Sequence, residues 1–256
     1  MKKILLWAVL TCMAGLPALA QPKIVAHRGY WRAEGSAQNS LTSLKKAYEA
    51  GCYGSEFDVW ITTDGVPVVT HDAVWDGTRI EDATYAELQF RQLANGEFLP
   101  TLQQYLQLGK TMPDMQLIFE IKTHKNDERN DKVTKMSVDL VKKLGLEDQV
   151  EYIAFSKRVC QKLAEFTPGS KIAYLNGDLS PREAKEQLHC NGIDYNESVF
   201  KKHPEWLQEA EKEGIEVNVW TVDGEENLRN HVNTKGIDII TTNDPNILSD
   251  IITKKK

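Results

Sequence analysis

The fold is decided by a stretch of eight residues, SEFDVWIT, at positions 55–62. Its length and its aromatic and β-branched residues predict a strand that is buried in a sheet. Glu56 and Asp58 lie two positions apart, so their side chains point to the same face of that strand. Burying two acids in an otherwise apolar strand is costly unless they pair or bind something. The same eight residues therefore predict both a core element and a polar site.

Short apolar runs alternate with amphipathic segments over the rest of the chain. The other predicted strands are residues 23–26, 66–71, 117–122, 150–156, 171–175, 192–196, 216–222 and 237–242. The predicted helices are residues 40–51, 101–109, 128–144, 157–166, 181–188, 204–214, 225–232 and 245–252. Residues 66–71 are expected to extend strand 55–62 or to pair with it through the turn at 63–65, which leaves eight strand–helix units. Eight such units in 256 residues favour a parallel sheet closed into a (β/α)8 TIM barrel.

The regular alternation is interrupted at residues 73–99, which contain the turn sequence DGT at 76–78. We interpret these residues as an insertion after the second strand that covers one rim of the barrel. No change in composition and no Pro/Ser-rich linker marks a second domain. Residues 21–256 are therefore predicted to form a single domain.

Residues 1–20 have the pattern of a secretory signal peptide. Lys2 and Lys3 precede an apolar run at 4–16, and the small residues Ala18 and Ala20 mark a cleavage site. The run is too short to span a bilayer, so we expect no stable membrane insertion. An alternative is a lipoprotein with a lipid attached to Cys12. The preceding threonine and the short apolar run argue against this alternative. We expect an exported protein, periplasmic or secreted.

Charge and cysteine content narrow the class of partner. The chain carries a net charge of −6, and loss of residues 1–20 with their two lysines makes it −8. Such an acidic protein is a poor general binder of nucleic acid or of anionic lipid surfaces. Cys52, Cys160 and Cys190 show no zinc-like spacing and are expected to be buried apolar residues. The expected partner is a small molecule, and the sequence does not distinguish a monomer from a homodimer.

Three acids are expected to meet at one rim of the barrel. Active-site residues of such barrels come from the C-terminal ends of different strands. Glu56 and Asp58 lie on strand 55–62, and Glu120 lies on strand 117–122. Carboxylates aimed at one point repel each other unless a cation lies between them, which makes Ca²⁺ or Mg²⁺ the expected ligand. The alternative for Glu120 is a simple ion pair with Lys122, two positions on.

Two histidines and two cationic side chains fall at the same rim. His27 and Arg28 follow strand 23–26, His71 ends residues 66–71, and Lys122 follows Glu120. Imidazoles can move protons on both sides of a phosphate near neutral pH, and the cations can meet its charge. A lone histidine at a strand end is more often structural, and the remaining histidines, such as His124, are expected at the surface.

Together these residues carry a resemblance to the glycerophosphodiester phosphodiesterase family. The matching elements run in order over nearly the whole chain after residue 25: AHRG (26–29), QNS (38–40), EFDV (56–59), TDGVPVVTHD (63–72), FEIK (119–122), VNVWTV (217–222) and TNDP (242–245). The resemblance implies a barrel with a small insertion after strand 2. It also implies hydrolysis of glycerophosphodiesters to glycerol 3-phosphate and an alcohol.

The resemblance also implies a role for each residue. Glu56, Asp58 and Glu120 would be metal ligands, and His27 and His71 would be the base and the acid. Arg28 and Lys122 would hold the phosphate, and Trp220 would line the substrate side. The chain has Gln38 where family members usually carry glutamate. This removes a negative charge near the expected metal. The sequence leaves open whether the charge of nearby Glu34 replaces it.

Other functions stay open at this point. A phospholipase D-like or phosphoinositide-type enzyme would act on intact lipids and would need an apolar or basic rim. A non-catalytic module would bind phosphodiesters without hydrolysing them, against which the two histidines argue. A carbohydrate isomerase on the same barrel is a further possibility, because a fold does not imply a function.

Overall fold

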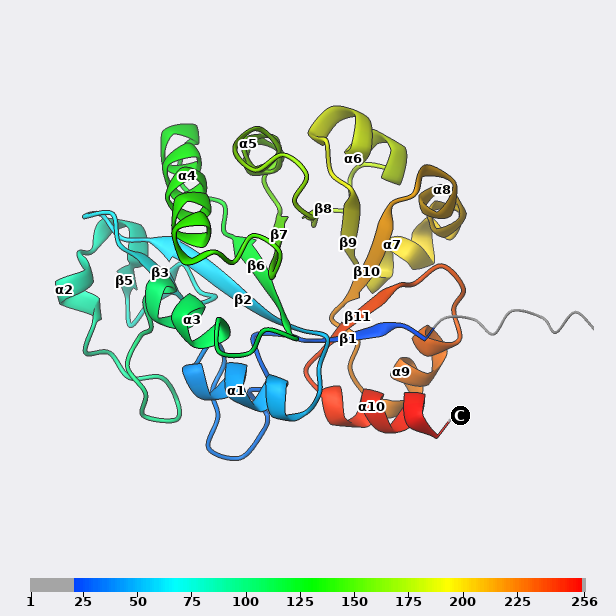
Figure 1. The fold of residues 1–256 in the computed structure, drawn as a ribbon, viewed down its shortest axis with the longest axis horizontal. Helices are drawn as coiled ribbons and strands as arrows, with labels where there is room; N and C mark the ends of the chain where they lie inside the picture. The colour runs from blue at the N-terminus through cyan, green and yellow to red at the C-terminus, as the bar shows by residue number, and fades with distance from the viewer. Residues whose placement is uncertain (1–20, 255–256) are drawn as a thin grey trace, which may run out of the picture.

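A closed parallel barrel forms the centre of the molecule in the computed structural model, which describes residues 21–254 (Figure 1). The predicted signal peptide lies outside the described residues. The barrel strands are β1 (Lys23–Ala26), β2 (Gly54–Ile61), β6 (Gln116–Ile121), β7 (Val150–Ala154), β8 (Ile172–Tyr174), β9 (Gly192–Asn196), β10 (Glu216–Trp220) and β11 (Ile239–Thr242). Each pairs in parallel with the next, and β11 returns to β1, with Lys23 opposite Ile239. The prediction of an eight-stranded parallel barrel is confirmed.

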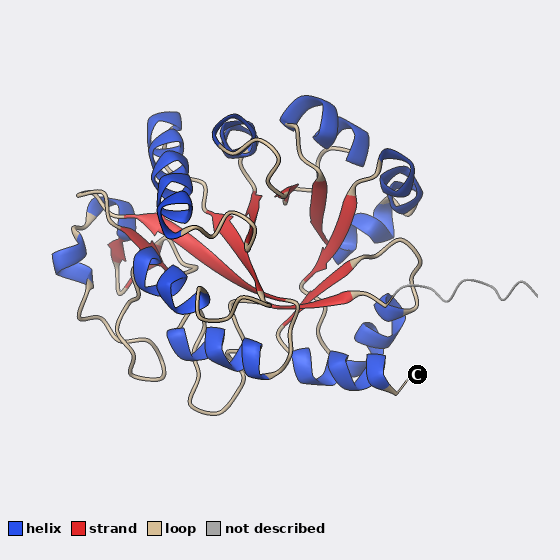
Figure 2. Ribbon diagram, in the orientation of Figure 1, coloured by secondary structure: helices blue, strands red, loops and turns tan. Residues whose placement is uncertain are grey.

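Helices surround the barrel, as Figure 2 shows. They are α1 (Leu41–Glu49), α3 (Leu102–Gly109), α4 (Asp127–Leu144), α5 (Lys157–Phe166), α6 (Pro181–Leu188), α7 (Glu197–Lys202), α8 (Glu205–Glu213), α9 (Glu225–Val232) and α10 (Pro245–Thr253). Their first turns follow the predicted signals, for example the capping box of Ser180 with Glu183 and the proline at the start of α10.

Helix α7 was not predicted. It has six residues, begins directly at the end of β9, and buries only Phe200. A helix with a single buried residue has no apolar period that a sequence pattern can detect. The side chain of Asn196 caps it by accepting a hydrogen bond from the backbone nitrogen of Ser198 (3.1 Å).

Residues 66–71 form the short strand β3 (Pro67–Val69), which runs antiparallel to the end of β2. Val59 lies opposite Val69, and Ile61 lies opposite Pro67. Of the two arrangements predicted for this segment, pairing through the turn at 63–65 is therefore the one observed. The hairpin runs back along β2, so that the Thr70 amide donates to the Asp58 carbonyl at 3.0 Å and His71 follows beside the acids.

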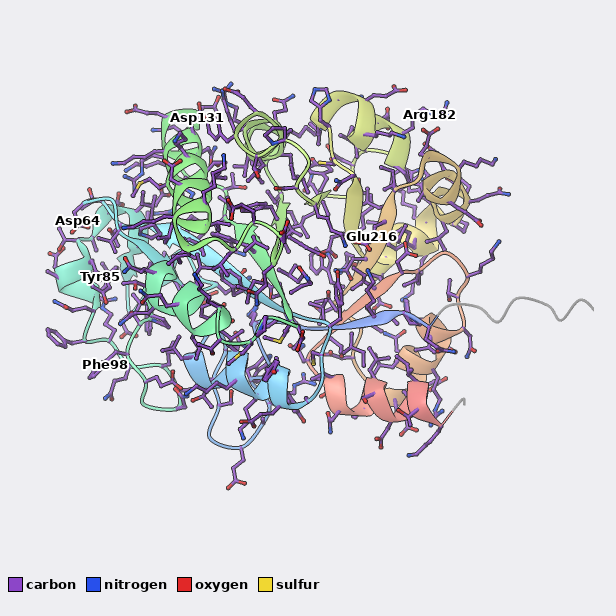
Figure 3. The ribbon with its side chains drawn as sticks, in the orientation of Figure 1. Asp64, Tyr85, Phe98, Asp131, Arg182 and Glu216 are labelled. Atoms are coloured by element: carbon purple, nitrogen blue, oxygen red, sulfur yellow. The ribbon has the colours of Figure 1, made fainter. Side chains whose placement is uncertain are left out.

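Residues 73–99 form a small folded segment beside β2 and β3. It contains β4 (Val74–Trp75), β5 (Thr78–Arg79), the 3₁₀ turn η1 (Ile80–Asp82) and α2 (Tyr85–Leu88). Ile80, Leu88 and Leu99 pack with Trp60 and Val68 in a core cluster of their own. Tyr85 and Phe98 lie at the edge of the molecule, where Figure 3 labels them. We call this segment the insertion.

Strand alternation sends aromatic side chains outward and acids inward. Phe57 stacks on Tyr105 of α3 (ring centroids 4.4 Å apart) and on Phe119 of β6 (4.8 Å), so it joins the barrel to its helices. Its neighbours Glu56 and Asp58 must therefore face the barrel interior, because successive residues of a strand point to opposite sides. The core packing thus determines where the acids lie.

Candidate active site

The three predicted acids meet at the C-terminal rim of the barrel. Asp58 of β2 lies opposite Glu120 of β6 in the strand register. One carboxylate oxygen from each of Glu56, Asp58 and Glu120 lies within 4.8 Å of the others, and all three side chains are buried. The backbone of two adjacent strands, β2 and β6, sets the positions of these side chains.

Lys122 lies between two of these acids. Its Nζ is 2.8 Å from Asp58 Oδ1 and 2.8 Å from Glu120 Oε1. The ion pair with Glu120 that the spacing allowed is therefore present, but Lys122 also pairs with Asp58. Burial alone would lower the pKa of Lys122, but the two carboxylates raise it above its usual range. This amino group carries its charge at any working pH.

The acids do not all ionise easily together. Burial, with the nearby charges of Asp58 and Glu120, raises the pKa of Glu56 well above its usual range. Burial and Asp58 raise the pKa of Glu120 to about 8. For Asp58, burial acts in the same direction, but Lys122 and His71 bring its pKa below the usual range. One lysine does not balance three carboxylates, so the set fits a further cation with a preference for oxygen ligands.

Arg28 connects the β1 turn to the acids. Its backbone adopts the left-handed region with φ of 56°, and its amide donates to Glu56 Oε2 at 2.7 Å. The guanidinium donates to Gln38 Oε1 at 2.7 Å, and Nε lies 3.9 Å from Asp58 Oδ2. The next residue is Gly29, where φ is 73° and a Cβ atom would collide with Ser43. Only glycine allows this tight turn.

Asn39 holds Asp58 in place from the β1–α1 loop. Its Nδ2 donates to Asp58 Oδ2 at 2.8 Å, and its Oδ1 accepts from the Asp58 backbone amide at 3.1 Å. Sequence reasoning assigned no role to this residue beyond its place in the QNS element. Gln38 bonds to Arg28, while Glu34 is exposed on the same loop. Arg28 thus meets a neutral amide at position 38.

A hydrogen-bonded chain sets the tautomer of His27. Trp31 Nε1 donates to Asn243 Oδ1 (2.7 Å), while Asn243 Nδ2 donates to Asp223 Oδ2 (2.7 Å), so the amide has only one possible orientation. His27 Nδ1 lies 2.9 Å from the same Oδ1 and must carry the proton. Its Nε2 is left with a lone pair. Burial and the charge of Arg28 lower the pKa of His27 to about 4, so the ring is neutral at pH 7.

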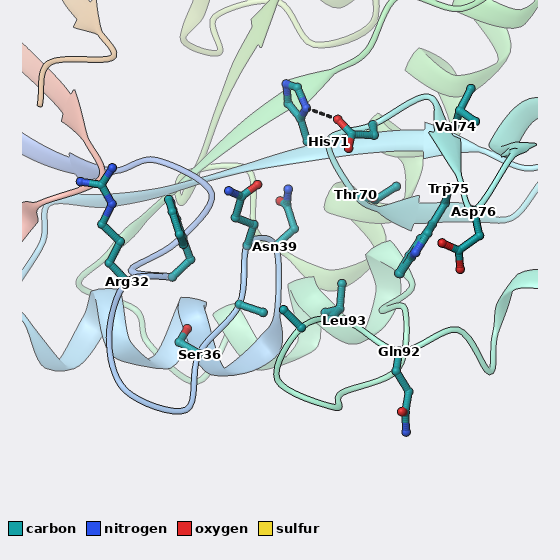
Figure 4. A pocket seen from close by; sticks show the side chains of 15 residues that line it. Arg32, Ser36, Asn39, Thr70, His71, Val74, Trp75, Asp76, Gln92 and Leu93 are labelled. Atoms are coloured by element: carbon teal, nitrogen blue, oxygen red, sulfur yellow. Dashed lines mark hydrogen bonds and ion pairs between the residues drawn. The ribbon is translucent and has the colours of Figure 1, made fainter.

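His71 lies at the start of the insertion and is more accessible. Its Nδ1 is 2.8 Å from Asp72 Oδ1, a contact that Figure 4 draws as a dashed line. Its backbone carbonyl accepts a hydrogen bond from Trp60 Nε1 at 3.0 Å. About 38 % of the side chain is exposed, so the ring is accessible to solvent. The two histidines thus differ in burial and in partner.

Both imidazoles line one cavity of about 140 Å³. Seven of the eight predicted site residues line it, and the eighth, Asp58, lies behind Lys122. Trp220 forms a wall, with its Nε1 donating to the backbone oxygen of Asp194 at 2.8 Å. The other lining residues are Ile153, Phe155, Leu175, Asp194, Thr221 and Thr241. The structure therefore brings the predicted residues together.

Comparisons with known proteins agree with this geometry. Residues 27–247 match the model of the Glycerophosphoryl diester phosphodiesterase family. The chain belongs to this family. It is similar to the crystal structure of a glycerophosphodiester phosphodiesterase from Parabacteroides distasonis, with 43 % identity, a TM-score of 0.90, and coverage of 93 % of this chain and 100 % of that one. The enzyme class is phosphoric diester hydrolase.

More distant relatives match over nearly the whole chain. A glycerophosphodiester phosphodiesterase from Caldanaerobacter subterraneus is 26 % identical over 245 residues, which cover 90 % of this chain and 98 % of the relative. A phosphodiesterase from Oleispira antarctica, solved with sn-glycerol-3-phosphate, is 24 % identical with a TM-score of 0.77 and covers 91 % of this chain and 97 % of that one. The barrel is thus kept as the sequences diverge.

In the present protein, a wide groove of about 810 Å³ adjoins the 140 Å³ cavity, and His71 lines both. Figure 4 shows Arg32 and Ser36 on its β1–α1 side and Trp75 and Asp76 on its insertion side. The groove is open, and both polar and apolar side chains line it. Within residues 21–254, no helix has both the length and the apolar character to cross a membrane.

Proposed function

We propose that this protein hydrolyses glycerophosphodiesters to glycerol 3-phosphate and an alcohol, with Ca²⁺ or Mg²⁺ as cofactor. The observation that carries the proposal is the shared cavity, in which two imidazoles of different environment flank buried acids and cations. Glycerol 3-phosphate is also the product bound to the Oleispira antarctica relative. The small volume of the cavity suits a glycerol phosphate rather than an acylated lipid.

Glu56, Asp58 and Glu120 would hold the cation. All three ligands offer oxygen, the donor that both ions prefer, and burial together with the neighbouring carboxylates raises the pKa of Glu56 and of Glu120. When bound, such an ion supplies positive charge against a phosphoryl oxygen. Lys122 limits the negative charge of the set, because it already neutralises part of Asp58 and Glu120.

His27 acts as the base in this proposal. Its Nδ1 proton is held by Asn243, so Nε2 takes the proton of the attacking hydroxyl, which belongs either to water or to the substrate's own glycerol. The new P–O bond forms as this proton leaves. Attack by glycerol would give a cyclic phosphate, which water then opens to the monoester by breaking one ring P–O bond, and attack by water would give the monoester directly.

His71 acts as the acid. Asp72 orients its ring, and the imidazolium gives its proton to the oxygen of the departing alcohol as that P–O bond breaks. The alcohol then leaves into the groove. Arg28 and Lys122 hold the phosphate oxygens at the cavity mouth, while Trp220 packs against the carbon atoms of the substrate.

The proposed function is tested by a product screen. Purified protein with each metal is incubated with glycerophosphodiesters of choline, ethanolamine, glycerol and inositol, and products are followed by ³¹P NMR. We expect glycerol 3-phosphate from one or more of them and none from intact phospholipid vesicles. Hydrolysis of vesicles alone would favour the lipid-directed alternative, for which the exposed Phe90 and Phe98 of the insertion would offer an apolar contact. Binding without product would identify a non-catalytic module.

Asn243 is a positioning residue for His27. In Asn243→Leu, the Nδ1 proton loses its acceptor and both tautomers become populated, so we expect kcat to fall by about tenfold or more. In the control, Trp31→Phe, the His27 contact is kept and the loss should be smaller. The ¹⁵N NMR signals of the His27 ring report the tautomer directly. An unchanged tautomer in Asn243→Leu would contradict this role.

Cation affinity should depend on pH. The pKa of Glu120 is raised to about 8 without metal, so below pH 8 its carboxyl holds a proton that a binding ion must displace. Each displaced proton weakens binding by about tenfold per pH unit as the pH falls. Calorimetric Ca²⁺ titrations at pH 6, 7 and 8, in buffers of different ionisation enthalpy, measure affinity and proton release. Equal affinity at all three pH values would contradict this prediction.

We further propose export with cleavage after Ala20. The support is the sequence pattern of residues 1–20 alone. N-terminal sequencing of the protein recovered from outside the cytoplasm should begin at Gln21, whereas an intact Met1 would refute processing.

A further inference from the structure

One acid of the cavity has no part in the mechanism above. Asp194, on β9, is 2 % exposed, and within residues 21–254 its Oδ1 has no hydrogen-bond partner. Leaving a buried carboxyl oxygen unpaired costs free energy, and such groups in native structures call for an explanation. Because Asp194 lines the cavity, the missing partner can come from a molecule bound there.

The side chain next to Asp194 on β10 is already engaged. Asn218 lies opposite Asp194 in the strand register, and its Oδ1 accepts from Thr241 Oγ1 at 3.1 Å. The amide nitrogen is therefore the side-chain group of Asn218 that remains to orient the Asp194 carboxyl. Asp194 Oδ1 itself has no partner among the described residues.

The surroundings of this oxygen suit a short carbon chain with a hydroxyl. Ile153, Leu175 and Trp220 line the same cavity with apolar surface, and its volume is about 140 Å³. An apolar wall around one unpaired polar atom is the arrangement that selects a hydroxyl at a defined position. A bulky acyl chain would not fit in this volume.

Asp194 also lies deeper than the residues that hold the phosphate. It comes from the middle of β9, whereas Arg28 and Lys122 follow the ends of β1 and β6. With the phosphate at the mouth of the cavity, the hydroxyl of glycerol farthest from it reaches deepest. We propose that Asp194 binds this terminal hydroxyl and thereby selects substrates with an unmodified glycerol; this inference rests on the proposed function.

The experiment compares two substrates. Propane-1,2-diol 1-phosphocholine keeps the hydroxyl beside the phosphate-bearing carbon but lacks the terminal hydroxyl of glycerophosphocholine. We expect the wild-type protein to have a kcat/KM lower by about 10- to 100-fold for the analogue, because Asp194 Oδ1 stays unpaired with it. This part of the test needs no variant and is independent of any folding defect.

Two variants assign the discrimination to Asp194. In Asp194→Leu, of similar size and apolar, the ratio of the two kcat/KM values should approach one, mainly through loss on glycerophosphocholine. In the conservative control, Asp194→Asn, a polar group still faces the hydroxyl and much of the ratio should remain. Circular dichroism verifies that both variants are folded.

The outcomes separate this inference from the proposed function. Equal kcat/KM values for the two substrates in the wild-type protein would overturn the role of Asp194 while leaving the phosphodiesterase activity in place. An equal loss on both substrates in Asp194→Leu would assign Asp194 a structural role instead. Hydrolysis of neither substrate by the wild-type protein would overturn the proposed function, and this inference with it.

Discussion

His27→Ala and His71→Ala are each expected to lower turnover of glycerophosphocholine by about 10²-fold or more, with the fold intact. The two imidazoles line the same cavity, and no other described histidine does. Removal of either leaves one proton transfer without a partner. His203→Ala is the matched control, since that ring stacks on Trp206 away from the cavity and its loss should leave turnover near normal.

A second substrate separates the roles of the two histidines. The 4-nitrophenyl ester of glycerol 3-phosphate has a leaving group that departs without protonation. His71→Ala should therefore recover most of its activity on this ester, while His27→Ala should stay impaired. The reverse pattern would exchange the two roles. Near-normal turnover of glycerophosphocholine by either variant would remove that histidine from the mechanism.

Removal of the cation is expected to have an effect of similar size. Treatment with EDTA should lower activity by about 10²- to 10³-fold, because the phosphoryl oxygen loses the charge that opposes it. Added Ca²⁺ or Mg²⁺ should restore it, and calorimetry should detect one bound ion. Glu120→Gln should weaken this binding, because the variant removes one of the three clustered carboxylates. Full activity in protein shown to be metal-free would exclude the ion.

Much of the site was predictable because it depends on local rules. Glu56 and Asp58 share a face through strand alternation, and Glu120 joins them because parallel strands end at one rim. These rules require no knowledge of distant contacts. Asp194 carries the same signal, an acid within the apolar strand 192–196, and a systematic search for such acids would have found it.

Other features depend on contacts between distant segments. His124 was expected at the surface, and this was wrong. It is buried, with Nδ1 on the Lys122 carbonyl (2.7 Å) and Nε2 accepting from the Ile61 amide (3.0 Å). Burial lowers the pKa of this ring, which is consistent with a neutral residue that joins two strands. A sequence pattern does not reveal a partner 63 positions away.

The sequence by itself determined the barrel and the acids and histidines at its rim. It also determined the resemblance to the phosphodiesterase family. Each of these follows from residue type and short spacing, through strand and helix periods and the common end of parallel strands. Only the tertiary structure decided the tautomer of His27, the anchoring of Asp58 by Asn39 and the unpaired oxygen of Asp194. These depend on hydrogen bonds between loops and strands whose relative positions are set by packing of the whole chain.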